Sequence, residues 1–245
     1  MKYKIAWSGL ADAGYWNMIA KFCVPSWRKL PGEKFIVHDS NLINLDFIKI
    51  VDWSVVCNRN SKFLKMTSKS KPLGFWRKMQ SQIWAVKNLK EYDFLVLLDT
   101  DVEILDFDVE KFEAEIEKLI ESGNVWATGC SQSGGLDAGH IILKMDHPSL
   151  QKLMTDYENI WESGQILKLE KWYDGNAVES LFEKYPSHRI KNRDYGKGLH
   201  VYEIGTVHWG SKLPKQLRAE WTGDGKSLVE KRLSEIVIKK YKNAD

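Results

Sequence analysis

The sequence predicts an α/β fold in which helices flank a mostly parallel central sheet, and two observations predict it. Strand-like and helix-like segments alternate along the chain, as in parallel sheets with crossover helices. Residues 94–98 form a continuous apolar run, Phe-Leu-Val-Leu-Leu, which is typical of a strand covered on both faces. In open sheets of this kind, ligands bind at the carboxyl ends of the strands.

The elements follow from local patterns. The expected strands are residues 4–7, 34–38, 53–57, 94–98, 125–129, 138–145 and 201–207. The expected helices are residues 15–27, 76–89, 110–121, 150–163, 174–185 and 226–241. Apolar side chains recur at helical spacing in 76–89 and 150–163, and 110–121 and 226–241 are amphipathic. Residues 58–72 are polar and basic, so we expect a surface excursion there.

Composition bounds the class of protein. A chain of 245 residues with 43% hydrophobic content can bury one substantial core. We therefore expect one catalytic domain, residues 1–218, and a basic helical tail, residues 219–245. The net charge of +3 suits an anionic small ligand better than nucleic acid.

The cysteines and the apolar runs bear on location. Three widely spaced cysteines form neither a disulfide framework nor a cysteine-rich zinc site. No apolar stretch has the layout of a signal peptide or the length of a membrane span. The default expectation is a cytoplasmic protein of undetermined oligomeric state.

A carboxylate pair follows the apolar run at residues 94–98. Asp99 and Asp101 flank Thr100 at the point where a parallel sheet delivers side chains to a ligand crevice. Such carboxylates can converge on one hard cation, Mg²⁺ or Mn²⁺, which completes its shell with substrate phosphates. The alternative is that the pair caps a following helix. A second Asp-x-Asp, at residues 106–108, follows no such run and is expected to cap a helix.

The segment 76–102 resembles the glycosyltransferases of the GT-A fold, the Rossmann-like fold of nucleotide-diphospho-sugar transferases. It is most similar to the family 8 group that contains glycogenin and the lipopolysaccharide galactosyltransferases. The resemblance implies that Asp99, Thr100 and Asp101 meet the cation and the donor. It also implies that Lys78, on the preceding helix, lies at the diphosphate or sugar edge.

Three further segments match in the family's order. Residues 137–143 resemble the strand that lies against the donor sugar, which implies roles for Asp137 and Gly139. Residues 174–182 resemble a helix start that places Asp174 near the sugar hydroxyls, although Gly175 replaces the family's glutamine. That glutamine is tied to retention of the anomeric configuration.

Residues 208–214 resemble the family's C-terminal signature, shortened in each gap. The likeness implies that His208 is a third metal ligand beside Asp99 and Asp101, and that Gly210 and Lys212 meet the diphosphate. Neutral imidazole can bind manganese, and an ammonium group can meet a phosphate as a point charge. In the family, the first strand and turn hold the base and ribose. The corresponding residues here are Ala6, Trp7, Ser8, Gly9 and Tyr15.

The implied activity is metal-dependent transfer of a hexosyl group from a nucleotide sugar, by the resemblance a uridine diphosphate sugar, with retention. The implied acceptor is a glycan, a lipid-linked molecule or another hydroxyl. Asp174, Asp137 and Lys212 are the catalytic candidates, and an inverting enzyme would use Asp137 or Asp174 as its base.

Two other functions remain open: a haloacid-dehalogenase-like phosphatase with Asp99 as nucleophile, and a non-catalytic carbohydrate-binding protein, which would explain eleven tryptophans. The tail either packs on the domain or contacts a membrane.

Overall fold

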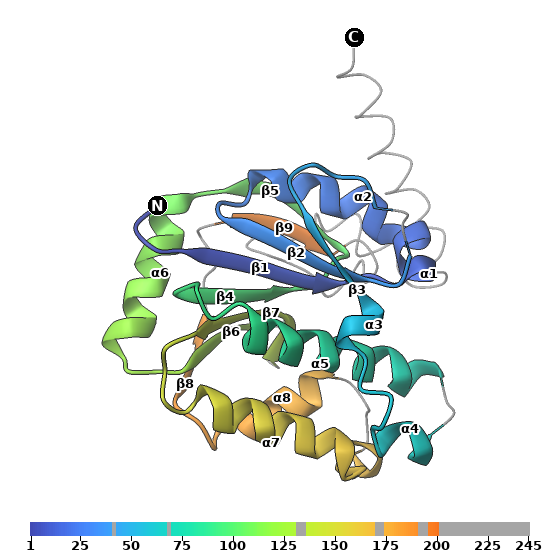
Figure 1. The fold of residues 1–245 in the computed structure, drawn as a ribbon. Coiled ribbons are helices and arrows are strands. Elements are labelled where there is room, and N and C mark those ends of the chain that lie inside the picture. The colour runs from blue at the N-terminus through green and yellow to red at the C-terminus, as the bar shows by residue number, and fades with distance from the viewer. Residues whose placement is uncertain (41–42, 68–69, 131–135, 170–173, 191–195, 201–245) are drawn as a thin grey trace, which may run out of the picture.

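A seven-stranded sheet forms the centre of the molecule, with strand order β3-β2-β1-β4-β7-β6-β8 (Figure 1). The computed structural model describes residues 1–40, 43–67, 70–130, 136–169, 174–190 and 196–200. The strands are β1 (Ile5–Leu10), β2 (Glu33–His38), β3 (Lys49–Asp52), β4 (Phe94–Leu98), β6 (Trp126–Cys130), β7 (Leu136–Lys144) and β8 (Ser187–Ile190). A second, two-stranded sheet pairs β5 (Val102–Phe107) with β9 (Gly196–His200).

The central sheet is mostly parallel, and β7 is its one reversed strand. β1 pairs in parallel with β2 and β4, β2 with β3, and β6 with β8. β7 runs antiparallel to both neighbours, β4 and β6. The amino-terminal end of β7 therefore lies at the edge where the other strands have their carboxyl ends.

Helices cover both faces of the sheet. The helical segments are α1 (Ala13–Tyr15), the π turn η1 (Trp16–Ala20), α2 (Lys21–Cys23), the 3₁₀ segment η2 (Val24–Lys29), α3 (Trp53–Val56), α4 (Phe63–Met66), α5 (Ser70–Asn88), α6 (Val109–Glu121), α7 (Leu150–Glu162), the 3₁₀ segment η3 (Gln165–Lys168) and α8 (Asp174–Phe182). In Figure 1, α5, α7 and α8 lie below the sheet, and α2 with the β5–β9 pair lies above it.

Each face of the sheet has its own core because side chains alternate along a strand. Leu95 and Leu97 join the core shared with α5 and α7, whereas Phe94, Val96 and Leu98 join the core shared with α6 and η2. All five side chains of β4 are buried, as the continuous apolar run predicts.

Most expected elements are confirmed, with ends shifted by a few residues. In α5, the four apolar positions at helical spacing are buried: Trp76, Met79, Ile83 and Val86. The strand expected at residues 53–57 is wrong. Residues 49–52 form the strand, and Trp53–Val56 is a helix, because the Asp52 side chain accepts a hydrogen bond from Ser54 N at 2.7 Å and caps the first turn.

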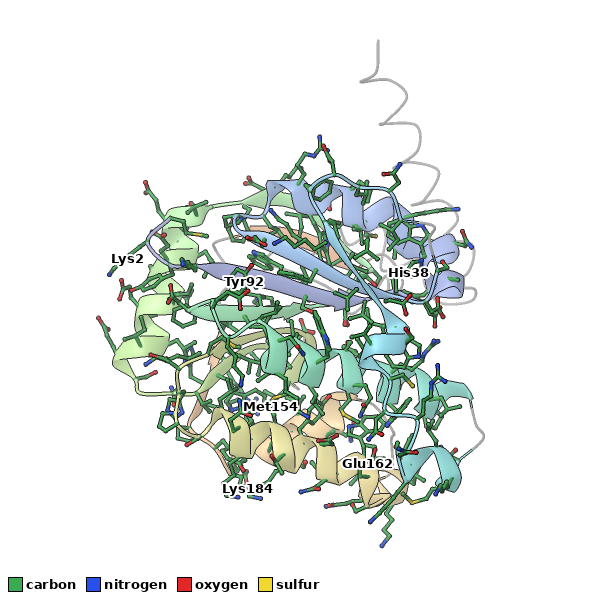
Figure 2. All side chains as sticks on the ribbon, viewed as in Figure 1. Lys2, His38, Tyr92, Met154, Glu162 and Lys184 are labelled. Atoms are coloured by element: carbon green, nitrogen blue, oxygen red, sulfur yellow. The ribbon has the colours of Figure 1, made fainter. Side chains whose placement is uncertain are left out.

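The polar excursion at residues 58–72 contains α4 and is held by a distant carboxylate. Glu162, at the end of α7, accepts hydrogen bonds from Ser61 Oγ at 2.5 Å and Lys62 N at 2.7 Å, and it lies beside α4 in Figure 2. Phe63 is fully buried and packs edge-on against Trp161 at a centroid distance of 5.4 Å. The excursion is therefore anchored to the domain.

The strand expected at residues 201–207 and the basic tail lie outside the described residues. Within the described part of the chain, no helix combines the length and the apolar character that crossing a membrane requires.

Candidate functional site

The carboxylate pair lies in a turn between two strands. Asp99 N donates to Gly139 O at 2.9 Å, and Val102 N donates to Asp99 O at 3.1 Å. The chain then enters β5, and the N-cap of the next helix is Asp108, which accepts from Lys111 N at 3.1 Å. The alternative that the pair caps a helix is therefore wrong, and the expected capping role of the second Asp-x-Asp is confirmed at Asp108.

Asp99 forms an ion pair with Lys78. Lys78 Nζ lies 2.5 Å from Asp99 Oδ1, and the side chains of Lys78 and Asp99 are only 17% and 26% exposed. Asp99 continues the alternation of Leu95 and Leu97 and so faces α5, the helix that carries Lys78. The structure therefore brings the expected basic residue directly to the first aspartate.

Asp101 is the more buried of the two aspartates, at 5% exposure. Its Oδ1 is inaccessible to solvent and accepts no hydrogen bond from any residue in the described ranges. A side-chain hydrogen bond links Asp101 to Tyr15. Burial, followed by the negative charges of Asp101 and Asp99, raises the pKa of the Tyr15 hydroxyl well above its usual value, so this hydroxyl is protonated and donates to Asp101.

Thr100 joins the carboxylate turn to the end of β1. Its Oγ1 donates to Leu10 O at 2.7 Å. Gly9 gives it room, because a Cβ at Gly9 would lie 2.7 Å from Thr100 Cγ2 and 2.8 Å from Leu98 O. The expected site residues Gly9, Thr100 and Tyr15 therefore belong to the same edge as the two aspartates.

The start of β7 forms the adjoining wall. Asp137 Oδ1 accepts from Gly139 N at 2.9 Å, and Gly139 in turn receives the Asp99 N–H. The start of α8 lies alongside, since a Cβ at Gly175 would be 3.9 Å from Leu136 O. Asp174 is the first residue of α8, so its backbone is near Asp137.

The structure does not bring the early part of β1 to this edge. Ala6 and Trp7 are completely buried, and Ser8 is only 3% exposed. The Trp7 ring stacks on Phe112 at 5.5 Å, within the core shared with α6. Only the last residues of β1 and the turn that follows reach the site, because the middle of a central strand is covered on both faces.

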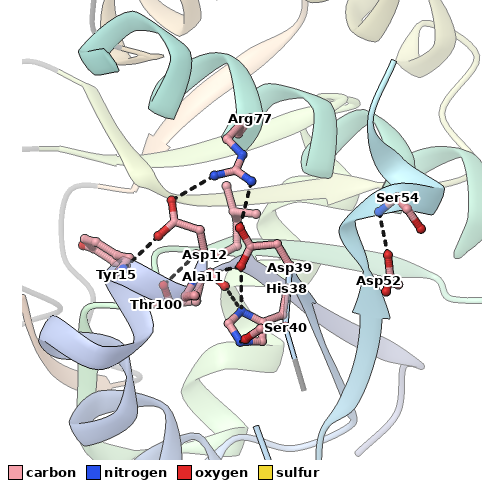
Figure 3. Close-up of polar contacts among 12 residues, drawn as sticks. Ala11, Asp12, Tyr15, His38, Asp39, Ser40, Asp52, Ser54, Arg77 and Thr100 are labelled. Carbon is pink, nitrogen blue, oxygen red and sulfur yellow. Dashed lines mark hydrogen bonds and ion pairs between the residues drawn. The ribbon is translucent and has the colours of Figure 1, made fainter. Parts of the chain in front are cut away.

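A cluster that the sequence analysis missed fixes this turn. The Arg77 guanidinium contacts Asp12 Oδ2 at 3.1 Å and Asp39 Oδ2 at 3.0 Å (Figure 3). Asp12 Oδ1 accepts from Tyr15 N, and Asp39 Oδ1 accepts from Ala13 N, both at 2.8 Å. Arg77 thus ties α5 to the segments that follow β1 and β2.

A buried histidine, His38, also contacts the turn that follows β1. His38 Nδ1 donates to Ala11 O, and His38 Nε2 accepts from Ser40 Oγ at 2.8 Å. A carbonyl oxygen can only accept, which assigns the proton to Nδ1. The signal that could have found this cluster is the position of Asp12 and Asp39, each just past a parallel strand.

The described residues fit a cation that takes few protein ligands. They contain no group of three or more His, Cys, Asp or Glu side chains arranged to hold a metal. Asp101 offers a buried oxygen without a partner, and carboxylate oxygens suit Mg²⁺ or Mn²⁺. His208, Gly210 and Lys212 lie outside the described residues.

Comparison with known proteins supports the fold. A scan for known protein families finds no match, and a search of curated proteins finds none either. Among solved structures, the glycosyltransferase GlyE of Streptococcus pneumoniae TIGR4 matches 95% of this chain at 11% identity with a TM-score of 0.53. Galactosyltransferase LgtC, in complex with donor and acceptor sugar analogues, matches 77% at 13% identity with a TM-score of 0.48.

The bifunctional glycosyltransferase WbbM matches 78% of this chain at 12% identity with a TM-score of 0.48. The chain spans 64% of the length of GlyE, 74% of LgtC and 39% of WbbM. The likeness to GlyE confirms the predicted fold, that of GT-A glycosyltransferases, and at this identity it shows the fold alone.

Proposed function

We propose that this protein is a glycosyltransferase that moves a sugar from a nucleotide diphosphate sugar to a hydroxyl acceptor with the help of a divalent cation. The observation that carries the proposal is the buried, unpartnered Oδ1 of Asp101. A buried polar atom without a partner costs stability, and a bound cation would remove that cost. The shared fold supports sugar transfer over other metal-dependent chemistry.

The residues that would hold the cation are Asp101 and Asp99, with His208 as the proposed third ligand. Two carboxylates and one Lys78 ammonium leave a net charge of −1 among these three described side chains, which favours a cation. When bound, Mn²⁺ or Mg²⁺ neutralises the charge that develops on the departing diphosphate.

The chain's own residues fix both aspartates before a ligand arrives. Lys78 holds Asp99, and the protonated hydroxyl of Tyr15 holds Asp101. Groups placed in advance where charge develops stabilise a transition state without reorganisation during the reaction. Gly9 and Tyr15 are the proposed contacts to the base and ribose at this edge.

In the proposed reaction, the anomeric C–O bond to the diphosphate breaks, a bond to the acceptor oxygen forms, and the acceptor proton is released. Asp137 and Asp174, at the starts of β7 and α8, are the proposed polar groups beside the sugar. Lys212 and Gly210 are proposed to meet the diphosphate. A uridine diphosphate donor, retention and a glycan or lipid-linked acceptor complete the proposal, on the strength of the resemblance.

The test is release of free nucleoside diphosphate from a panel of nucleotide sugars, with and without Mn²⁺. We expect Asp101→Asn to lower the turnover number by roughly a hundredfold to a thousandfold, the usual cost of one preorganised electrostatic partner. The matched control is Asp106→Asn, the same chemical change in the exposed second Asp-x-Asp.

Two results would contradict the proposal. One is equal turnover by wild type and Asp101→Asn. The other is metal-dependent release of phosphate from simple phosphomonoesters with no activity on nucleotide sugars, which would favour the phosphatase.

A further inference from the structure

The segment from Trp53 to Lys90 is strongly basic. It contains nine Lys and Arg residues and no Asp or Glu. The whole chain carries a net charge of only +3, so the remaining residues contain more acidic than basic side chains. This segment contains α3, α4 and α5. Arg77 and Lys78 of α5 are paired with aspartates, so we consider the basic residues of α3, α4 and the segment between them.

α3 and α4 each pack an aromatic ring on Trp76, in the amino-terminal half of α5. Trp53 of α3 contacts Trp76 at a centroid distance of 6.2 Å, and Phe63 of α4 contacts the same ring at 6.4 Å. Both helices lie on the right in Figure 1, the side on which the arrowhead of β1 marks the carboxyl edge. α3, which directly follows the carboxyl end of β3, is the nearer of the two to that edge.

The exposed surface of α3, α4 and the segment that joins them combines basic and apolar side chains. We call it the α3–α4 face and define it by Val55, Arg59, Lys62, Lys65 and Met66, all of which are exposed. Val55 is 70% exposed and Met66 is 43% exposed, two of the four exposed large apolar side chains found among the described residues. Isolated exposed apolar residues are common, but two of them in a segment of twelve residues, 55–66, that also exposes three basic side chains make this segment amphipathic.

The charges on the α3–α4 face are not neutralised locally. Within the described ranges, no acidic side chain forms an ion pair with Arg59, Lys62 or Lys65. Glu162, which contacts this part of the chain, accepts hydrogen bonds from Ser61 Oγ and Lys62 N. The positive charge is therefore available to an external anion.

The face is also fixed in place, because α4 is anchored beneath it. Phe63 is fully buried against Trp76 and Trp161, and Glu162 holds the chain that enters α4. Binding through this face therefore needs no ordering of the backbone of α3 or α4, which lowers its entropic cost.

We propose that the α3–α4 face binds the surface of an anionic membrane. Lysine and arginine beside an apolar side chain match phospholipid headgroups above an acyl layer. Nucleic acid fits less well, because the aromatic rings of α3 and α4, Trp53 and Phe63, point inward and offer no stacking platform. If the proposed function holds, this contact keeps the enzyme at a surface that can carry lipid-linked acceptors, and the binding test below does not depend on activity.

The experiment is co-sedimentation of the full chain with vesicles of phosphatidylcholine alone or with phosphatidylglycerol added. We expect binding only to the anionic vesicles, and weaker binding as salt is raised. Each basic residue near such a surface contributes about a fivefold change in affinity, so Arg59→Gln/Lys65→Gln should bind about 30-fold more weakly. Val55→Ser should lose about fivefold through its apolar contact.

The matched control is Lys87→Gln/Lys90→Gln, which removes the same charge from exposed positions at the other end of α5. The control should bind like wild type. The proposal is overturned if the wild type does not bind anionic vesicles, or if both double variants bind equally well. It is also overturned if dextran sulfate binds as tightly as the vesicles and Val55→Ser changes nothing, since that result would indicate a soluble polyanion.

Discussion

Gly9→Ala tests whether close packing between β1 and the carboxylate turn supports the site. The added Cβ would lie 2.7 Å from Thr100 Cγ2, 2.8 Å from Leu98 O and 2.9 Å from Trp27 Cη2. One of these atoms is a backbone carbonyl of a central strand and cannot rotate away. Overpacking of this kind costs about 1–3 kcal/mol, and we expect the upper end.

Alanine also lowers the conformational entropy of the unfolded chain relative to glycine, which stabilises the variant by about 0.4–1 kcal/mol. The net cost of Gly9→Ala is therefore about 2 kcal/mol, which corresponds to a fall of about 4–8 °C in Tm for a chain of this size. Because the clash pushes on Thr100, between the two aspartates, we also expect weaker Mn²⁺-dependent binding of nucleotide diphosphate.

The measurements are thermal unfolding by circular dichroism and isothermal titration with nucleotide diphosphate and Mn²⁺. Gly74→Ala is the matched control, because Gly74 lies in α5 with no atom within 4 Å of an added Cβ. It should raise stability by about 0.5–1 kcal/mol and leave binding unchanged. A Gly9→Ala variant with the Tm and nucleotide affinity of the wild type would refute this reasoning.

Two further predictions concern stability. Burial alone would raise the pKa of Asp39, but hydrogen bonds from Ala13 N and the Arg77 guanidinium lower it below its usual value. The stabilisation from Asp39 is thus present above the usual pKa of 3.8 and lost as pH falls through the lower pKa of the folded state. The difference in the free energy of unfolding in urea between wild type and Asp39→Asn should therefore shrink with acidification. A difference that stays constant with pH would contradict this role of Asp39. Phe63→Ala removes a fully buried ring and should cost about 3–5 kcal/mol in the same urea assay, whereas a cost below about 1 kcal/mol would show that the α4 anchor is not formed.

The sequence predicts β1, β2 and β4 well because their signals are local, whereas the short strands β3 and β8 are not predicted at residues 49–52 and 187–190. The apolar run of β4 and the helical spacing in α5 depend only on residues close in the chain. The strand expected at residues 53–57 is wrong because local propensity does not decide the structure of this segment. Trp53 and Val56 favour a strand by propensity. The Asp52 cap, together with the packing of Trp53 on Trp76, which is distant in the sequence, makes residues 53–56 a helix instead.

The candidate site is predictable where a residue directly follows a strand, as Asp99 and Asp101 do. The resemblance implies that Lys78 lies at the donor edge, but it does not predict the ion pair of Lys78 with Asp99, which depends on the face that Asp99 shares with α5. The Arg77 cluster escapes sequence reasoning because its three members come from α5 and two separate turns. No local pattern links side chains so far apart in the sequence.

Arg77 and Lys78 are adjacent in sequence yet contact the turns that follow two neighbouring strands, β1 and β4. Consecutive residues on an α-helix point about 100° apart, so one helix anchors the turn after β1 through Asp12 and the turn after β4 through Asp99. Any roll of α5 about its axis would move both anchors at once. The spacing between the two turns therefore depends on this one helix, and a one-residue insertion ahead of Arg77 that altered its phase would disturb both turns together.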